Sequence, residues 1–149
     1  MIQVEHMEWK QPEGIRRHWV LEDLDAELLF QPAPVNAAQG RVGEEVYQLR
    51  DGGALRKKRT LSAGKTVLAT MEEKAAGTGG ILRYGAREFL WKQENQFGTR
   101  WVLQDADGKA VFAFAFKQGF GKVARVETAG GTAEEIGPLL LLCWYVTVL

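Results

Sequence analysis

The chain contains one short pattern twice. Residues 19–30 align without a gap with residues 101–112, and six of the twelve aligned positions are identical, including the Trp-Val-Leu with which both copies begin. In each copy an aromatic and β-branched run meets an Asp-x-Asp turn and is followed by a second apolar run, which is typical of a β-hairpin. Residues 47–55 repeat the pattern more weakly. The repetition predicts a β-architecture built by duplication.

Further short segments with alternating apolar and polar residues follow at the spacing of sandwiches and barrels. We expect strands near residues 39–42, 45–49, 54–61, 66–71, 81–84, 88–92, 100–104, 109–117 and 122–127. In Val111–Phe116 the phenylalanines share one face and the small residues the other, as a closely packed barrel wall needs. Residues 66–76 also contain enough helix formers for a short helix, so both assignments stay open.

The C-terminal segment is different because it is apolar on every side. Glu134 and Glu135 suit the first turn of a helix, and Leu139–Leu149 carries a single polar side chain, Thr147. Twelve residues from Pro138 would span about 18 Å, well short of the roughly 30 Å hydrocarbon layer of a membrane. We therefore predict a helix at 134–149 that is buried in a protein core and is not transmembrane. Its Thr147 hydroxyl can bond to a carbonyl one turn back.

Composition and charge narrow the class of protein. The chain has 149 residues, of which 46% are hydrophobic and 26% charged, so it is expected to fold as one soluble domain. Residues 1–18 contain Pro12 and Gly14 and are expected to be an irregular lead-in, with the domain at 19–149. Nineteen basic residues balance nineteen acidic ones, so nucleic acid is not an expected partner. The single cysteine and the absence of a secretory signal indicate a cytoplasmic protein.

Taken together, these elements resemble the tubby C-terminal-like superfamily, which groups tubby domains, phospholipid scramblases and LURP-one-related proteins. The residues that carry the resemblance are the two Trp-Val-Leu-x-Asp-x-Asp hairpins, the hairpin at Tyr47–Gly53 and the segment Pro138–Tyr145. The resemblance implies a mainly β fold, a closed antiparallel barrel of about twelve strands with a pseudo-twofold repeat around a central hydrophobic helix. It also implies contact with phosphoinositides or membranes, which tubby domains make.

One basic cluster is a candidate binding site. It comprises Arg56, Lys57, Lys58, Arg59 and, across the following turn, Lys65. Anionic lipid headgroups attract such clusters. In a strand, however, Arg56 and Lys58 would face one side and Lys57 and Arg59 the other. The alternative is that these side chains protect an edge strand from aggregation.

The sequence offers little chemistry for an enzyme, a metal site or a cofactor. Ser62 lacks the context of a catalytic serine, Cys143 lies in the apolar helix, and His6 and His18 have no cysteine partner. We predict a non-enzymatic barrel without a cofactor, which binds anionic lipid or another protein. One alternative is an enzyme that uses carboxylates, and another is a hollow, lipocalin-like ligand barrel. The carboxylates available to an enzyme include Asp23, Asp25, Asp105, Asp107 and Glu127.

Overall fold

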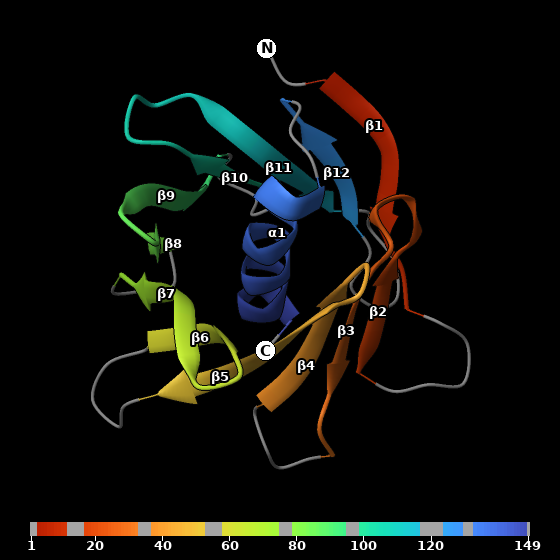
Figure 1. Ribbon diagram of the computed structural model, residues 1–149. Coiled ribbons are helices and arrows are strands. Elements are labelled where there is room, and N and C mark those ends of the chain that lie inside the picture. The colour runs from red at the N-terminus through yellow and green to blue at the C-terminus, as the bar shows by residue number, and fades with distance from the viewer. Residues whose placement is uncertain are drawn as a thin grey trace.

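Within the described residues, twelve antiparallel strands surround one C-terminal helix in the computed structural model of the protein (Figure 1). The structure describes residues 3–11, 17–32, 37–52, 58–74, 79–94, 99–116, 124–129 and 133–148. The strands are β1 (Gln3–Trp9), β2 (His18–Leu21), β3 (Ala26–Phe30), β4 (Ala37–Val42), β5 (Glu45–Gly52), β6 (Lys58–Ala63), β7 (Thr66–Glu73), β8 (Gly79–Tyr84), β9 (Arg87–Gln93), β10 (Arg100–Gln104), β11 (Ala110–Phe116) and β12 (Ala124–Thr128). A 3-10 helix, η1 (Glu22–Leu24), follows β2, and α1 (Ala133–Val148) follows β12.

The twelve strands form a nearly closed barrel. From β2 to β12 each strand pairs with the next one in the sequence, and β1 pairs with β12. Two hydrogen bonds between Lys10 and Val20 then join the end of β1 to β2, at 2.9 and 2.7 Å. The predicted antiparallel barrel around a C-terminal helix is confirmed.

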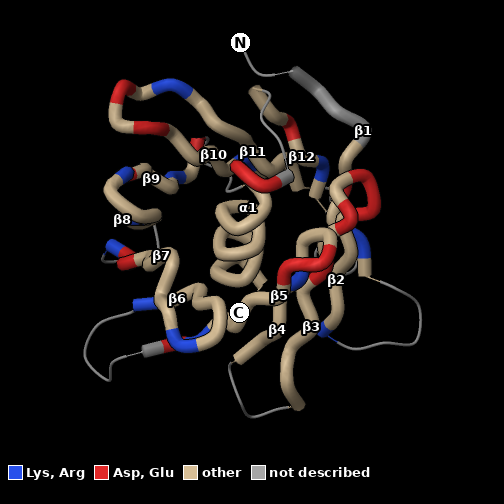
Figure 2. The backbone as a smooth tube through the Cα atoms, in the orientation of Figure 1, with Lys and Arg blue, Asp and Glu red and all other residues tan. Residues whose placement is uncertain are grey.

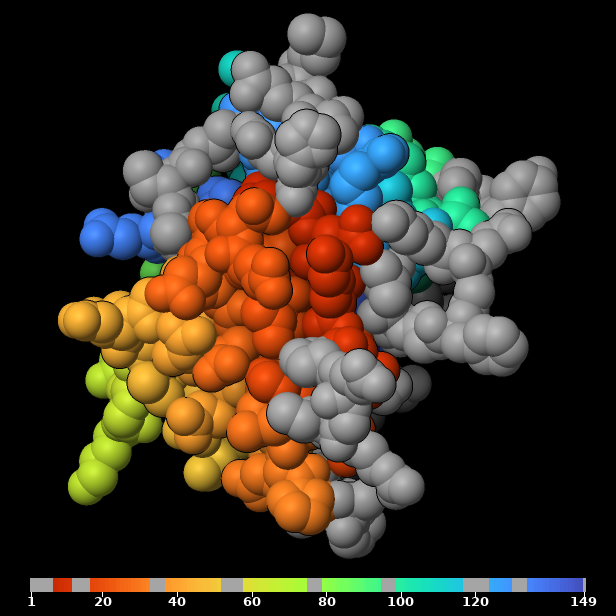
Figure 3. Space-filling model, turned by 90° about the vertical axis from the view of Figure 1, so that its right-hand side faces the viewer, coloured from red at the N-terminus to blue at the C-terminus, as the bar shows by residue number. Residues whose placement is uncertain are grey.

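The first strand corrects one expectation from the sequence. Residues 3–9, expected to be irregular, form β1, in which Trp9 is opposite Ala124 of β12. The Trp9 side chain is fully buried and stacks on Trp144 of α1, with ring centroids 5.2 Å apart. In Figure 3 the red surface of β1 borders both the orange surface of the following strands and the blue surface of β12. Burial of this tryptophan stabilises the strand. The polar composition of residues 1–18 and the presence of Pro12 therefore did not predict it.

Both copies of the repeat are hairpins, as predicted, but they are not related by the expected pseudo-twofold axis. In the first hairpin Trp19 lies opposite Leu28. Trp101 in the second lies opposite Phe114, whereas the sequence alignment would place it opposite Ala110. The hairpins also begin at β2 and β10, which are eight strands apart in the chain, whereas a twofold axis along a twelve-stranded barrel would place them six apart. The duplication of sequence is therefore not a duplication of position.

Residues 66–73, for which strand and helix were both open, form the strand β7. Its Ala69 and Met71 point into the barrel, where both are buried. Alternation at every second residue places these two side chains in the core, and this burial outweighs the helix propensity of the segment.

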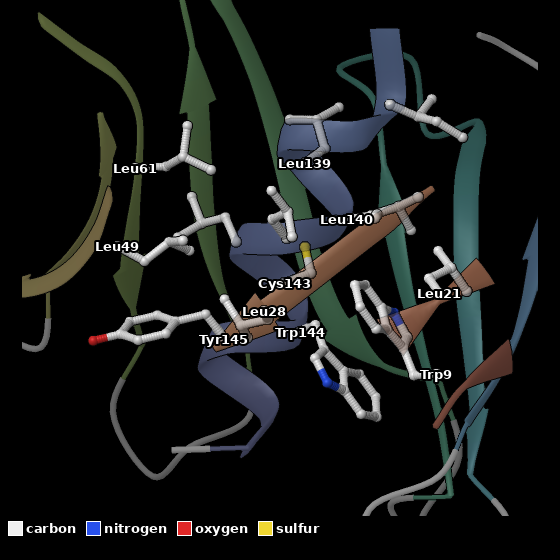
Figure 4. Packing of buried hydrophobic residues seen from close by; sticks show 14 of the residues in the cluster. Trp9, Leu21, Leu28, Leu49, Leu61, Leu139, Leu140, Cys143, Trp144 and Tyr145 are labelled. Carbon is white, nitrogen blue, oxygen red and sulfur yellow. The ribbon is translucent and has the colours of Figure 1, made fainter. Parts of the chain in front are cut away.

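The helix α1 fills the centre of the barrel, as Figure 4 shows for the side chains around Cys143. Its residues from Leu139 to Tyr145 are each no more than 2% exposed. They pack against inward-facing wall residues such as Leu28, Leu49 and Leu61. The Thr147 hydroxyl donates to the Cys143 carbonyl at 2.8 Å, as predicted. Because the helix occupies the lumen, the hollow-barrel alternative is wrong for this fold.

None of the helices in the described part of the chain is both long and apolar enough to cross a membrane.

Candidate functional site

The structure separates the three described members of the basic cluster that the sequence grouped, Lys58, Arg59 and Lys65. Lys58 and Arg59 begin β6 and face opposite sides of the wall, with Lys58 exposed and the Arg59 side chain 12% exposed. Lys65 lies in the β6–β7 turn, at the other end of a six-residue strand that is about 20 Å long. Arg56 and Lys57 lie outside the described residues. Because β6 pairs with both β5 and β7, it is not an edge strand, and the edge-protection alternative is wrong.

Arg59 belongs to an ion-pair network that anchors the helix. Its Nε lies 3.2 Å from Asp51 Oδ1, and its Nη1 lies 3.0 Å from Glu73 Oε1. The Tyr145 hydroxyl of α1 donates to the same Asp51 oxygen at 3.1 Å. Burial and the Asp51 carboxylate both raise the pKa of Tyr145, so this hydroxyl remains a hydrogen-bond donor at neutral pH. Arg59 therefore joins β5, β6, β7 and α1, and it is not free to bind an anion.

The two carboxylates of the second hairpin have a structural explanation. Asp105 Oδ1 accepts hydrogen bonds from the backbone N–H groups of Asp107 and Lys109, both at 2.9 Å. This is the turn geometry that short acidic side chains favour. Asp107 is exposed at the tip of the same turn.

The carboxylates of the first hairpin are also structural. Asp25 ends η1 with a left-handed φ of 49°, and its Oδ1 lies 3.2 Å from Arg41 Nη1. Asp23 is exposed within η1. In the described ranges, histidine, cysteine, aspartate and glutamate side chains form no group of three or more that could hold a metal.

Glu127, the remaining candidate, is ion-paired with Arg100 and lies 3.4 Å from Arg125. Hydrogen bonding from Arg100 lowers the pKa of Glu127, although burial partly opposes this effect. The carboxylate therefore stays ionised at neutral pH and is unsuited to act as a general acid.

The two ends of the barrel carry opposite charge. The end with the β2–β3, β4–β5, β6–β7, β8–β9 and β10–β11 turns and the start of α1 is here called the turn end, and the opposite end is the loop end. Figure 2 shows acidic segments at the β2–β3 and β4–β5 turns and at the start of α1. We count the described charged residues that lie in these turns, at the start of α1 or within two strand residues of a turn. The acidic ones are Glu22, Asp23, Asp25, Glu27, Glu44, Glu45, Glu88, Asp105, Asp107, Glu127, Glu134 and Glu135. The basic ones are Arg41, Lys65, Arg83, Arg87 and Lys109.

The loop end has the opposite balance. Its described basic residues, by the same measure, are Lys10, Arg17, Lys58, Arg59, Lys74, Lys92, Arg100 and Arg125, against the acidic Glu8, Asp51, Glu72, Glu73 and Glu94. Among the described residues, the four lysines of this set make no ion pair. The structure brings Lys74 and Lys92 to the same part of the wall as Lys58, which the sequence analysis missed. Strand pairing creates this group, and the only signal in the sequence was the position of each lysine at a strand end.

Comparison of the chain with protein-family models, with curated proteins and with solved structures finds no match.

Proposed function

We propose that this protein is a non-enzymatic binding module of the tubby C-terminal-like type, whose loop end contacts anionic lipid headgroups. The observation that carries the proposal is the separation of charge between the two ends of a barrel with no net charge. Such a distribution orients the molecule in an external field, so an anionic surface attracts the loop end and repels the turn end. The barrel with its filled lumen supports the tubby-like assignment.

The size of the attraction is consistent with weak, reversible contact. A lysine close to an anionic membrane contributes about 1 kcal/mol, and the contribution falls off within a Debye length. Four lysines at one end, for which the described part of the chain supplies no ion-pair partner, therefore support binding that salt should weaken. The cytoplasmic leaflet carries the negative surface potential that this contact needs, and the buried Cys143 suits a reducing compartment. Both features support a cytoplasmic location.

Vesicle co-sedimentation tests the proposal. We expect binding to vesicles of phosphatidylcholine mixed with phosphatidylserine, no binding to phosphatidylcholine alone, and loss of binding as salt is raised. Neutralising Lys10 and Lys58 should weaken the binding. The matched control, Glu22→Gln with Glu44→Gln at the turn end, should leave it unchanged or slightly stronger. No binding to the mixed vesicles at low salt, or equal binding to both vesicle types, would contradict the proposal.

A further inference from the structure

We propose that Lys58, Lys74 and Lys92 form a discrete site for a phosphate-type dianion on the outer wall of the barrel at its loop end. The inference rests on the proposed function and deepens it, because it replaces a diffuse basic surface with three named side chains and a preferred ligand charge. The three lysines come from β6, from the end of β7 and from β9. In Figure 2, basic segments occur on β6, at the end of β7 and on β9, on one side of the barrel.

The strand register brings Lys58 close to Lys74. Lys58 lies directly opposite Glu72 in the β6–β7 ladder, and Lys74 follows two residues later on the same face. Such diagonal neighbours are about 7–8 Å apart. Both side chains are exposed, so their ammonium groups can reach one small anion together.

The same register places Lys92 on the other side of Lys74. The Lys74 N–H donates to the Gly79 carbonyl at 2.7 Å, and Gly79 lies directly opposite Lys92 in the β8–β9 ladder. Lys74 and Lys92 are therefore separated by the width of β8, which is about 10 Å between the outer strands.

Gly79 keeps the space between these two lysines free of a side chain. Its φ of 132° is disfavoured for other residues, and a Cβ at this position would overlap the carbonyl oxygen of Trp91. The next residue, Gly80, is similarly restricted, because a Cβ there would overlap the carbonyl oxygen of Glu72. β8 therefore places no side chain between Lys74 and Lys92, and both glycines are themselves buried.

The nearby acidic residues define the charge that the site prefers. Glu72 lies beside Lys58, but its carboxylate pairs with Arg83 at 3.8 Å, and Arg83 also pairs with Glu88 at 3.3 Å. Glu94, two residues after Lys92, pairs with Arg100 at 3.4 Å. Three lysines, Arg83 and Arg100 against these three carboxylates leave the region with a net positive charge. A phosphomonoester carries a charge of about −1.5 to −2 at neutral pH. It is thus attracted more strongly than a singly charged carboxylate or phosphodiester.

The first experiment follows backbone amide NMR signals during titration with inorganic pyrophosphate. We expect the largest shifts at Gly79, Gly80 and the residues around the three lysines. The variant Lys58→Gln/Lys74→Gln/Lys92→Gln should bind at least about tenfold more weakly, since each lysine near a surface charge contributes roughly a fivefold change. The matched control is Lys65→Gln/Lys109→Gln at the turn end, which should bind as the unmodified protein does. Glu72→Gln should bind more tightly. Equal affinity of the triple variant and the control would overturn the site.

The second experiment distinguishes a lipid from a free phosphate compound. Vesicles containing phosphatidic acid, a phosphomonoester, are compared with phosphatidylserine vesicles of matched surface charge. If the protein prefers phosphatidic acid and the triple variant loses this preference, the site binds a lipid headgroup. If the protein binds pyrophosphate but no vesicles, the ligand is a free phosphate compound, and this result contradicts the proposed function but not the site. Vesicle binding that the triple variant retains in full contradicts the site alone.

Discussion

The helix α1 meets two very different walls of the barrel. It lies closest to β3–β7, where glycines lie at two points of close approach. A Cβ added to Gly40 of β4 would lie 2.8 Å from Leu141 Cδ1, and one added to Gly137 of the helix would lie 2.8 Å from Val42 Cγ1. Neither glycine has an unusual φ, so the close approach of helix and wall is what requires glycine at both positions.

The opposite wall is built from large aromatic side chains. Trp9 of β1 stacks on Trp144 of the helix, and Phe114 of β11 meets the same indole edge to face at 5.4 Å. Trp91 of β9 packs against Phe114 at 5.3 Å. An off-centre helix thus needs little volume on one side and much on the other, at native packing density. The β3–β7 wall should therefore be sensitive to substitutions that add volume, and the aromatic wall to substitutions that remove it.

The largest expected effect comes from a substitution in the helix, because it disrupts the packing of the helix against both walls. Leu140→Asp places a carboxylate at a fully buried position, at a cost of several kcal/mol that rivals the stability of a typical domain. We expect an insoluble or molten product, judged by the loss of near-UV circular dichroism. Leu29→Asp is the control, because Leu29 is 45% exposed and should tolerate the change. A cooperatively folded Leu140→Asp protein would contradict the central-helix core.

The next effect concerns the aromatic wall alone. Phe114→Ala removes a fully buried ring that packs against four aromatic neighbours, and it should destabilise the protein by about 3–5 kcal/mol in urea unfolding. Phe116→Ala is the comparison, because Phe116 is only partly buried and its loss should cost less. Equal losses for the two substitutions would mean that the wall does not fill volume as described.

The elements of the two walls differ in how far the sequence could predict them. Hairpins and the apolar helix depend on local patterns, and both were predicted. The register of the second hairpin was not, because shifting Trp101 from Ala110 to Phe114 moves the pairing by four residues. An even shift leaves every inward side chain inward, so alternation alone cannot distinguish the two registers.

The basic site illustrates the same limit. Adjacency in the sequence grouped Lys58 with Arg59, but alternation sends these side chains to opposite faces and places Arg59 between Asp51 and Glu73. Lys74 and Lys92 reach Lys58 only through the pairing of β6 to β9. A site that depends on cross-strand register could not be predicted before the register was known.

A smaller loss of stability is expected when volume is added to the β3–β7 wall. Gly40→Ala should destabilise the protein by about 1–3 kcal/mol, because the new methyl group would overlap Leu141. Combining it with Leu141→Ala provides the test, since removing the neighbouring side chain leaves space for the methyl group. The double variant should therefore be less destabilised than the sum of the two single variants. Additive losses in urea unfolding would contradict the close contact between this wall and the helix.

The smallest effect concerns an ion pair on the outer surface of each wall. Glu127 pairs with Arg100 on the aromatic side and its side chain is 9% exposed, whereas Glu27, on β3, is 35% exposed. Arg100 lowers the pKa of Glu127. Burial opposes ionisation of Glu27, but hydrogen bonds from Arg41 and His18 outweigh it, so that pKa is lowered too.

A carboxyl whose pKa is lowered by folding contributes stability above its unfolded pKa, and this contribution is lost as pH falls through the folded value. We therefore expect Glu127→Gln to cost on the order of 1 kcal/mol at pH 7. The difference from the unmodified protein should decrease as the pH falls below the ordinary glutamate pKa of about 4.3 and vanish only below the lowered pKa of folded Glu127. Glu27→Gln should show the same sign with a smaller amplitude, because water screens the more exposed pair. Urea unfolding at a series of pH values measures both differences. A cost of Glu127→Gln that is independent of pH would show that the ion pair with Arg100 adds no stability, and it would remove this electrostatic distinction between the two walls.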